Sequence, residues 1–149
     1  MPVRVEVDVA NGLPGFTIVG LTDRAIQEAR ERVKPAIRNA GFSFPQRRVT
    51  VNLSPAELPK EGSGFDVAIA IAVLRAEDQS LLLDGIAFIG ELALDASIRP
   101  VTGVLPMARC LAGAGIRRLI VPVENVQEAA LAEGIAVLGA RARRSGARA

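Results

Sequence analysis

Residues 59–66 are the part of this sequence whose residue types could carry chemistry, because they place Lys60 and Ser63 in a glycine-rich loop before an apolar run. A lysine beside a serine hydroxyl can act as the base for nucleophilic attack, provided that burial removes the charge of its ammonium. Glu61 follows Lys60 and favours a solvated, charged ammonium instead. A hydrolase that uses Ser63 and Lys60 is therefore the alternative interpretation of this loop.

The composition of the 149-residue chain excludes several other kinds of site. The chain contains no histidine and one cysteine, Cys110. Ser-His-Asp catalysis, a histidine-ligated metal, an internal disulfide and a Cys-rich zinc site are therefore all impossible. The sequence also lacks the Gly-x-x-x-x-Gly-Lys-Ser/Thr loop that cradles nucleotide phosphates. We expect no cofactor or metal in this chain.

The 18 basic and 16 acidic residues are unevenly distributed. Residues 141–149 hold Arg141, Arg143, Arg144 and Arg148 without any acidic residue, so the basic pI of about 9.3 comes from this tail. A basic tail can bind nucleic acid or acidic lipid, but it can equally be a disordered end or linker stub. The rest of the chain is slightly acidic and is no global polycation for DNA.

A second basic cluster is expected on the first helix and the strand after it. The candidate DNA-binding residues are Arg30, Lys34, Arg38, Arg47 and Arg48. The first three recur every four residues and therefore share one helix face, which could contact phosphates. Glu28 and Glu31 are close enough to pair with Arg32 and Lys34, so a solvated, salt-bridged face is the other interpretation.

The apolar pattern predicts one α/β (α+β) domain over residues 1–140, with a mixed sheet packed with helices. Asn11-Gly12 predicts a hairpin turn, which Leu13-Pro14-Gly15 lengthens, and Pro35 is expected to bend the first helix. Asn125 and Glu128 have the spacing of a capping box for the last helix. Strands are expected near residues 3–9, 16–19, 48–53, 86–89, 92–94, 118–121 and 135–138, and helices near 23–40, 65–75, 104–114 and from 126 onward.

No membrane or targeting segment is predicted. Val67–Leu74 is the longest apolar stretch, far below the roughly 20 residues that cross a bilayer. The chain begins without the apolar core of a signal peptide. We expect a cytoplasmic protein that does not contact membranes.

Three blocks in order resemble the proteolytic domain of Lon-type Ser-Lys proteases. They are Pro59-Lys60-Glu61-Gly62-Ser63-Gly64-Phe65-Asp66, Gly90-Glu91-Leu92-Ala93-Leu94 with Ile98-Arg99-Pro100-Val101-Thr102-Gly103, and Gly115-Ile116-Arg117-Arg118-Leu119-Ile120-Val121-Pro122. The resemblance implies a Lon-protease-domain-like fold. It also places Gly64 at the nucleophile position and Met107 at the lysine position. Neither residue supplies a hydroxyl or an amine, so no proteolysis is expected. Cys110, on the apolar face of its helix, is expected to be an inert core thiol, and Met107 is expected to serve packing.

A second resemblance covers about Val3 to Leu138. The segments that carry it are Val3–Asp8, Asn11–Leu21, Glu28–Val33, Arg48–Ala56 and Lys60–Asp66, which are similar to the N-terminal domain of the ComM/YifB family of magnesium-chelatase-like AAA+ ATPases. In that family a Lon-like domain without protease residues precedes a hexameric motor implicated in DNA branch migration during natural transformation.

The family resemblance implies an accessory, oligomerisation or DNA-positioning role, with ATP and Mg²⁺ confined to an ATPase module that this chain lacks. Expected partners are that module, neighbouring subunits of the hexamer and, weakly or indirectly, DNA. The loop residues Lys60, Glu61, Ser63 and Asp66 are a docking surface or the cap of the buried helix. Family members carry one more strand before the segment that starts at Val3, so an exposed edge and a dimer formed by strand pairing are expected here.

Overall fold

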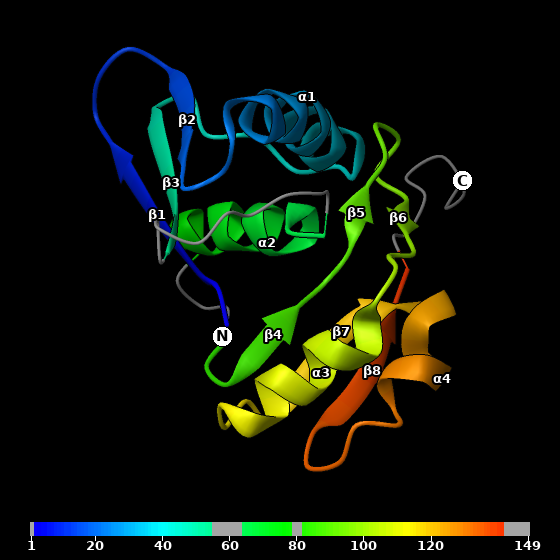
Figure 1. Cartoon of the computed structure of the whole chain (residues 1–149). Coiled ribbons are helices and arrows are strands. Elements are labelled where there is room, and N and C mark those ends of the chain that lie inside the picture. Colours follow the sequence, from blue (N-terminus) through cyan, green and yellow to red (C-terminus); the bar gives the residue numbers. More distant parts are fainter. Residues whose placement is uncertain (1, 55–63, 79–81, 142–149) are drawn as a thin grey trace.

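The computed structural model describes residues 2–54, 64–78 and 82–141, and it divides the strands among three small sheets (Figure 1). The α+β class predicted from the sequence is confirmed. In chain order the elements are β1 (Arg4–Ala10), β2 (Gly15–Val19), α1 (Asp23–Asn39), β3 (Arg48–Ser54), α2 (Asp66–Glu77), β4 (Ile86–Phe88), β5 (Glu91–Leu92), β6 (Ile98–Arg99), α3 (Val104–Gly113), β7 (Arg118–Pro122), the 3₁₀ turn η1 (Val123–Asn125), α4 (Val126–Ala129) and β8 (Ala136–Ala140).

The first sheet has the order β1-β3-β2 and mixes both strand directions. Strand β3 lies in the centre, antiparallel to β1 and parallel to β2. The hairpin predicted at Asn11-Gly12 is therefore wrong, since β3 separates the two strands that this turn joins. Val49, Val51 and Leu53 of the central strand β3 are fully buried, whereas the valines of β1 are only partly buried.

Helix α1 begins where the sequence places a cap. The Thr22 hydroxyl accepts a hydrogen bond from the Ala25 N–H at 3.2 Å. The helix continues through Pro35 to Asn39, and Val33, Ala36 and Ile37 on its inner face are buried. Its apolar stripe therefore covers the first sheet.

The second sheet has the order β4-β7-β8, with all neighbours parallel, and α3 and α4 lie against it (Figure 1). Strands β5 and β6 form a separate two-stranded antiparallel ladder beside α1 and α2, at the end away from the first sheet (Figure 1). The buried hydrophobic residues form two clusters. One contains β3, α1 and α2, and the other surrounds Val104, Ala108 and Leu119.

The capping box predicted at Asn125 and Glu128 is wrong. Neither side chain caps α4; both reach the segment that leads into α3. Asn125 accepts from the Val101 N–H at 3.0 Å and donates to the Val101 carbonyl at 2.9 Å, and Glu128 accepts from the Leu105 N–H at 3.1 Å. The N-cap position of α3 is Gly103, which has no side chain, so these residues from another element serve the start of α3 instead.

Within the described residues, no helix is both long and apolar enough to cross a bilayer.

Candidate functional site

A groove of about 1490 Å³ lies on the surface of the described residues. It is lined by residues of β1, of one face along the length of α2, of β4 and of α3. Gly64 and Met107, which the sequence places at the two protease positions, both line it. The fold therefore brings these two positions to one site although they are distant in the chain.

Backbone contacts between Gly64 and Gly90 fix the start of α2 at this groove. The Gly90 N–H donates to the Gly64 carbonyl at 3.0 Å, and the Val67 N–H donates to the Gly90 carbonyl at 3.2 Å. A Cβ at Gly90 would lie 2.8 Å from Val67 Cγ2 and 3.2 Å from Ile98 Cγ2. Only glycine permits this close approach. By contrast, a Cβ at Gly64 would meet nothing within 4 Å.

An ion pair between Arg32 and Asp66 joins α1 to the first turn of α2. Arg32 Nε lies 2.6 Å from Asp66 Oδ2 and Arg32 Nη2 lies 3.1 Å from Asp66 Oδ1. The Leu92 N–H also donates to Asp66 Oδ2 at 3.0 Å. The Asp66 side chain is 1% exposed. This carboxylate therefore holds α1, α2 and β5 together, and its place at the helix start also suits the helix dipole.

The electrostatics of the pair follow from its burial. Desolvation raises the pKa of the Asp66 carboxyl above its ordinary 3.8, while the hydrogen bonds from Arg32 and the Leu92 N–H oppose the rise. The hydrogen bond to Asp66 raises the pKa of the Arg32 guanidinium. A buried ion pair of this kind contributes little net stability, but the loss of one partner leaves an uncompensated charge.

The predicted docking loop is only partly described. Lys60, Glu61 and Ser63 lie outside the described residues. Asp66 is buried and fully engaged with Arg32 and Leu92, so it is not available to a docking partner and serves the alternative role as part of the helix start. An ionisable residue at the first turn of a nearly apolar helix signals a buried partner, but the sequence does not show which residue that is.

The five candidate DNA-binding residues have different environments. Arg30, Arg38 and Arg48 are exposed. Arg47 is exposed and donates to Asn11 Oδ1 at 3.0 Å. Lys34 is half-buried, with its Nζ 5.2 Å from the centroid of the Phe44 ring. The α1 face is therefore less uniform than its four-residue spacing predicts, and its contact with DNA stays a prediction.

The ion pairs predicted on α1 are also different. Glu28 pairs with Arg24 at 3.3 Å in an exposed contact, not with Arg32. Arg32 is committed to Asp66 because its side chain lies on the inner edge of α1, facing α2.

Cys110 was expected to be a core thiol and Met107 to serve packing, and the structure places both side chains at the groove. Met107 is 39% exposed, Cys110 is half-buried, and both line the groove. The core side of α3 is occupied by Val104 and Ala108. The helical spacing of apolar residues does not distinguish a core face from a groove wall.

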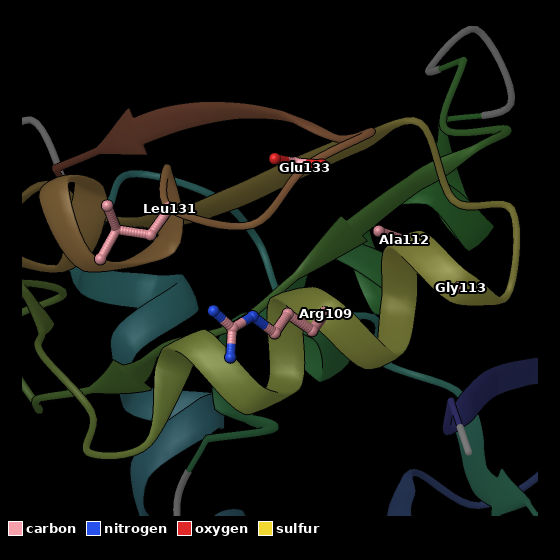
Figure 2. Close-up of a pocket in the computed structure, with 5 residues that line it drawn as sticks. All are labelled: Arg109, Ala112, Gly113, Leu131 and Glu133. Carbon is pink, nitrogen blue, oxygen red and sulfur yellow. The ribbon is translucent and has the colours of Figure 1, made fainter.

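A smaller hollow of about 400 Å³ lies between α3 and the chain that leads into β8. Figure 2 shows Arg109 on the α3 side and Leu131 and Glu133 on the opposite side. Arg109 and Glu133 are exposed, so the hollow has no buried polar group that could orient a ligand.

No metal centre is apparent in the described part of the chain, where no three His, Cys, Asp or Glu side chains are grouped. The placement of ATP and Mg²⁺ in a separate module stays a prediction.

The fold is that of a mixed α+β, Lon-like domain with a groove between its elements. The chain belongs to the family described as subunit ChlI of Mg-chelatase, whose sequence model matches residues 5–125. Competence protein ComM of Haemophilus influenzae is 47% identical over 131 residues, which are 87% of this chain and 26% of that protein. The protein YifB of Escherichia coli is 44% identical over 135 residues, which are 89% of this chain and 26% of that protein.

A more distant relative supports the Lon-like class. The Lon protease of Chloroflexus aurantiacus is 26% identical over 131 residues, 83% of this chain and 16% of that enzyme. The resemblances to ComM/YifB and to Lon inferred from the sequence are thus confirmed. The chain spans 26% of the length of ComM and of YifB, so it corresponds to one part of these relatives.

Proposed function

We propose that this chain is a non-catalytic accessory domain of a ComM-like AAA+ ATPase. It positions DNA or neighbouring subunits for a motor that carries the ATP and Mg²⁺ sites. Its place of action is the cytoplasm, and the parent protein drives branch migration of DNA during natural transformation. The family and the identity to ComM support this proposal.

The proposal that the domain has no catalytic activity rests on the types of residue that line the groove. Gly64 and Met107 line it at the two protease positions. None of the described residues that line the groove is serine, threonine, lysine or histidine. Cys110 supplies a thiol there, but the chain has no histidine that could activate it. A Ser-Lys mechanism needs both a hydroxyl and a neutral amine within reach of each other.

Exposed arginines support the DNA-positioning part. Arg30 and Arg38 on α1 and Arg48 at the start of β3 carry charges that are free to approach phosphates. Together with the slightly acidic character of residues 1–140, this supports weak, sequence-independent and salt-sensitive binding.

Two assays test the proposal. The first incubates the chain with a serine-reactive fluorophosphonate probe and with casein. No labelling and no cleavage are expected, whereas cleavage abolished by Ser63→Ala would establish the alternative hydrolase. The second reads the gene in frame beyond the codon for Ala149. A Walker A motif is expected there, and an uninterrupted reading frame without one would overturn the motor association.

A further inference from the structure

One aromatic side chain is presented at the surface of this domain. The chain contains five phenylalanines and no tryptophan or tyrosine, and all five lie in the described residues. Phe16 and Phe44 are buried, and Phe65 and Phe88 are half-buried against the first hydrophobic cluster. Phe42 is 55% exposed. More than half of the surface of this residue is therefore open to a partner.

The end of α1 fixes the position of Phe42. The Gly41 N–H donates to the Arg38 carbonyl at 3.0 Å, and the Phe42 N–H donates to the Ile37 carbonyl at 3.1 Å. Gly41 has a φ of +95°, as this kind of helix end requires. The backbone of Phe42 is thus tied to the last turn of α1. A ring on such a fixed backbone loses less conformational freedom on binding than a ring on a loose loop.

The chain around Phe42 is basic. Residues 33–48 contain no acidic residue, and their basic residues are Lys34, Arg38, Arg47 and Arg48. Arg38 is exposed and belongs to the same turn as Phe42, since its carbonyl accepts the Gly41 N–H. A cation beside an aromatic ring matches the two parts of a nucleotide, because the phosphate binds the cation and the base stacks on the ring. This charge favours a polyanion over a protein as the partner of Phe42.

The turn between β5 and β6 lies at the same end of α1 (Figure 1). Asn39 Nδ2 donates to the Leu94 carbonyl at 2.5 Å, which holds this turn against the helix end. Leu94 is 56% exposed and adds apolar surface there. Asp95 is the acidic residue of the turn, and its Oδ1 accepts from the Ser97 N–H at 3.0 Å and from the Ser97 hydroxyl at 2.7 Å. Its charge is therefore partly satisfied within the turn.

We propose that Phe42 stacks on an unpaired base of single-stranded DNA while Arg38 contacts an adjacent phosphate. A base inside a duplex is covered by its neighbours on both faces, whereas an unpaired base offers a face to an aromatic side chain. Phe42 therefore favours single-stranded over duplex DNA and has no preference for sequence. The inference rests on the DNA-positioning part of the proposed function and names the form of DNA that this end of α1 binds.

Fluorescence anisotropy of the whole chain with labelled oligothymidylate, and with an oligo(dA)·oligo(dT) duplex of the same length, tests the inference. Phe42→Leu keeps an apolar side chain but removes the ring. It should raise the dissociation constant for oligothymidylate roughly tenfold. The dissociation constant for the duplex should stay unchanged.

The salt dependence separates the two residues. Arg38→Gln removes a phosphate contact and should weaken the binding of both DNAs. It should also reduce the magnitude of the slope of log affinity against log salt concentration for the single strand by about 0.7. Phe42→Leu removes no charge and should leave this slope unchanged.

Phe42→Trp gives a direct readout of stacking. The chain contains no tryptophan, so the introduced indole is its sole source of tryptophan fluorescence. Oligothymidylate should quench this fluorescence, and the duplex should not. Leu131→Ala removes an exposed apolar side chain elsewhere and serves as the control, with unchanged affinity for both DNAs. Thermal unfolding followed by circular dichroism checks that each variant is folded.

The inference would be overturned by an affinity for oligothymidylate that Phe42→Leu leaves unchanged, by an equal loss of duplex affinity, or by an indole that the single strand does not quench. If Phe42→Leu spares DNA binding but weakens self-association in sedimentation equilibrium, the ring belongs to a protein contact instead. DNA binding that depends on Arg38 and not on Phe42 contradicts this inference alone. If the unaltered chain binds neither DNA, the DNA-positioning part of the proposed function fails with it.

Discussion

Arg32 and Asp66 lie 34 residues apart in the sequence and form a two-point ion pair, with Arg32 Nε 2.6 Å from Asp66 Oδ2. The pair joins α1 to the start of α2, next to the groove that Gly64 lines. Its geometry explains why a charged residue begins a nearly apolar helix. It also makes the stability of this region dependent on both partners.

Replacement of Arg32 by methionine should lower the free energy of unfolding at pH 7 by about 3–5 kcal/mol, because Asp66 is left buried without its counter-charge. Burial already raises the pKa of Asp66 above 3.8, and loss of the Arg32 hydrogen bonds raises it further. The native variant then keeps a proton at pH values where the unfolded chain has lost it. Its free energy of unfolding should therefore recover as the pH falls through the raised pKa.

Urea denaturation between pH 7 and pH 4 measures this recovery, with Arg32→Met/Asp66→Asn as the matched control. The double variant has no carboxyl at this position and should lack the pH-dependent component. Parallel pH profiles for the single and double variants would contradict the prediction.

Alanine substitutions at Gly20 and Gly41 allow the energetic cost of a steric clash to be distinguished from the cost of a left-handed backbone conformation. Both have positive φ, +101° and +95°. A Cβ at Gly20 would lie 2.1 Å from the Leu53 carbonyl oxygen, whereas a Cβ at Gly41 meets nothing within 4 Å. Gly41→Ala should cost about 1–2 kcal/mol from the left-handed backbone alone. Gly20→Ala should cost about 1–3 kcal/mol more, since β2 must move from β3. Equal losses in chemical denaturation would show that the Leu53 contact relaxes freely.

The Asn125 side chain makes hydrogen bonds to both the N–H and the carbonyl of Val101. Removal of this side chain should therefore destabilise the segment that leads into α3. Asn125→Ala leaves the Val101 N–H and carbonyl without these partners and should cost about 2 kcal/mol. Gln127→Ala, at an exposed position two residues away, should change stability by less than about 0.5 kcal/mol. Hydrogen exchange of the Val101 amide provides the local readout, and unchanged protection in Asn125→Ala would refute the assignment.

Restoration of the protease residues should not restore proteolysis. Gly64→Ser has room for its side chain, and Met107 is exposed enough to accept lysine, so Gly64→Ser/Met107→Lys should fold. A Ser-Lys pair also needs surrounding groups that hold both side chains and desolvate the amine. We expect no casein cleavage, with Gly64→Ala/Met107→Leu as the matched control. Turnover by the serine–lysine variant alone would show that the supporting residues are still present.

DNA binding by α1 should depend on Arg30 and Arg38 more than on Lys34, whose ammonium lies over the Phe44 ring. We assume that each arginine neutralises one DNA phosphate and so releases a counterion. Arg30→Gln/Arg38→Gln should then reduce the magnitude of the negative slope of log affinity against log salt concentration by about 1.8. Lys34→Gln should change the slope less. Arg109→Gln on α3 serves as the control, and fluorescence anisotropy with labelled duplex DNA gives the measurement. A slope that α1 variants leave unchanged would place any binding elsewhere.

Local sequence patterns were sufficient to predict most helices and strands and to identify the family. The alternation from Arg48 to Leu53, the cap at Thr22 and the stop at Gly41 depend on neighbours in the sequence, and the structure has each of them. The Lon-like blocks were also recognisable from the order of residues alone, and the relation to Lon is confirmed.

Contacts between distant segments were decided by the tertiary structure. The sequence could not show that β3 lies between β1 and β2, that Arg32 pairs with Asp66, or that Asn125 serves the start of α3 and not its own helix. In each case several partners satisfy the same local rule, and the choice depends on which apolar faces are buried together. Local hydrogen-bonding and periodicity determine the elements, whereas burial of their combined surfaces determines their partners.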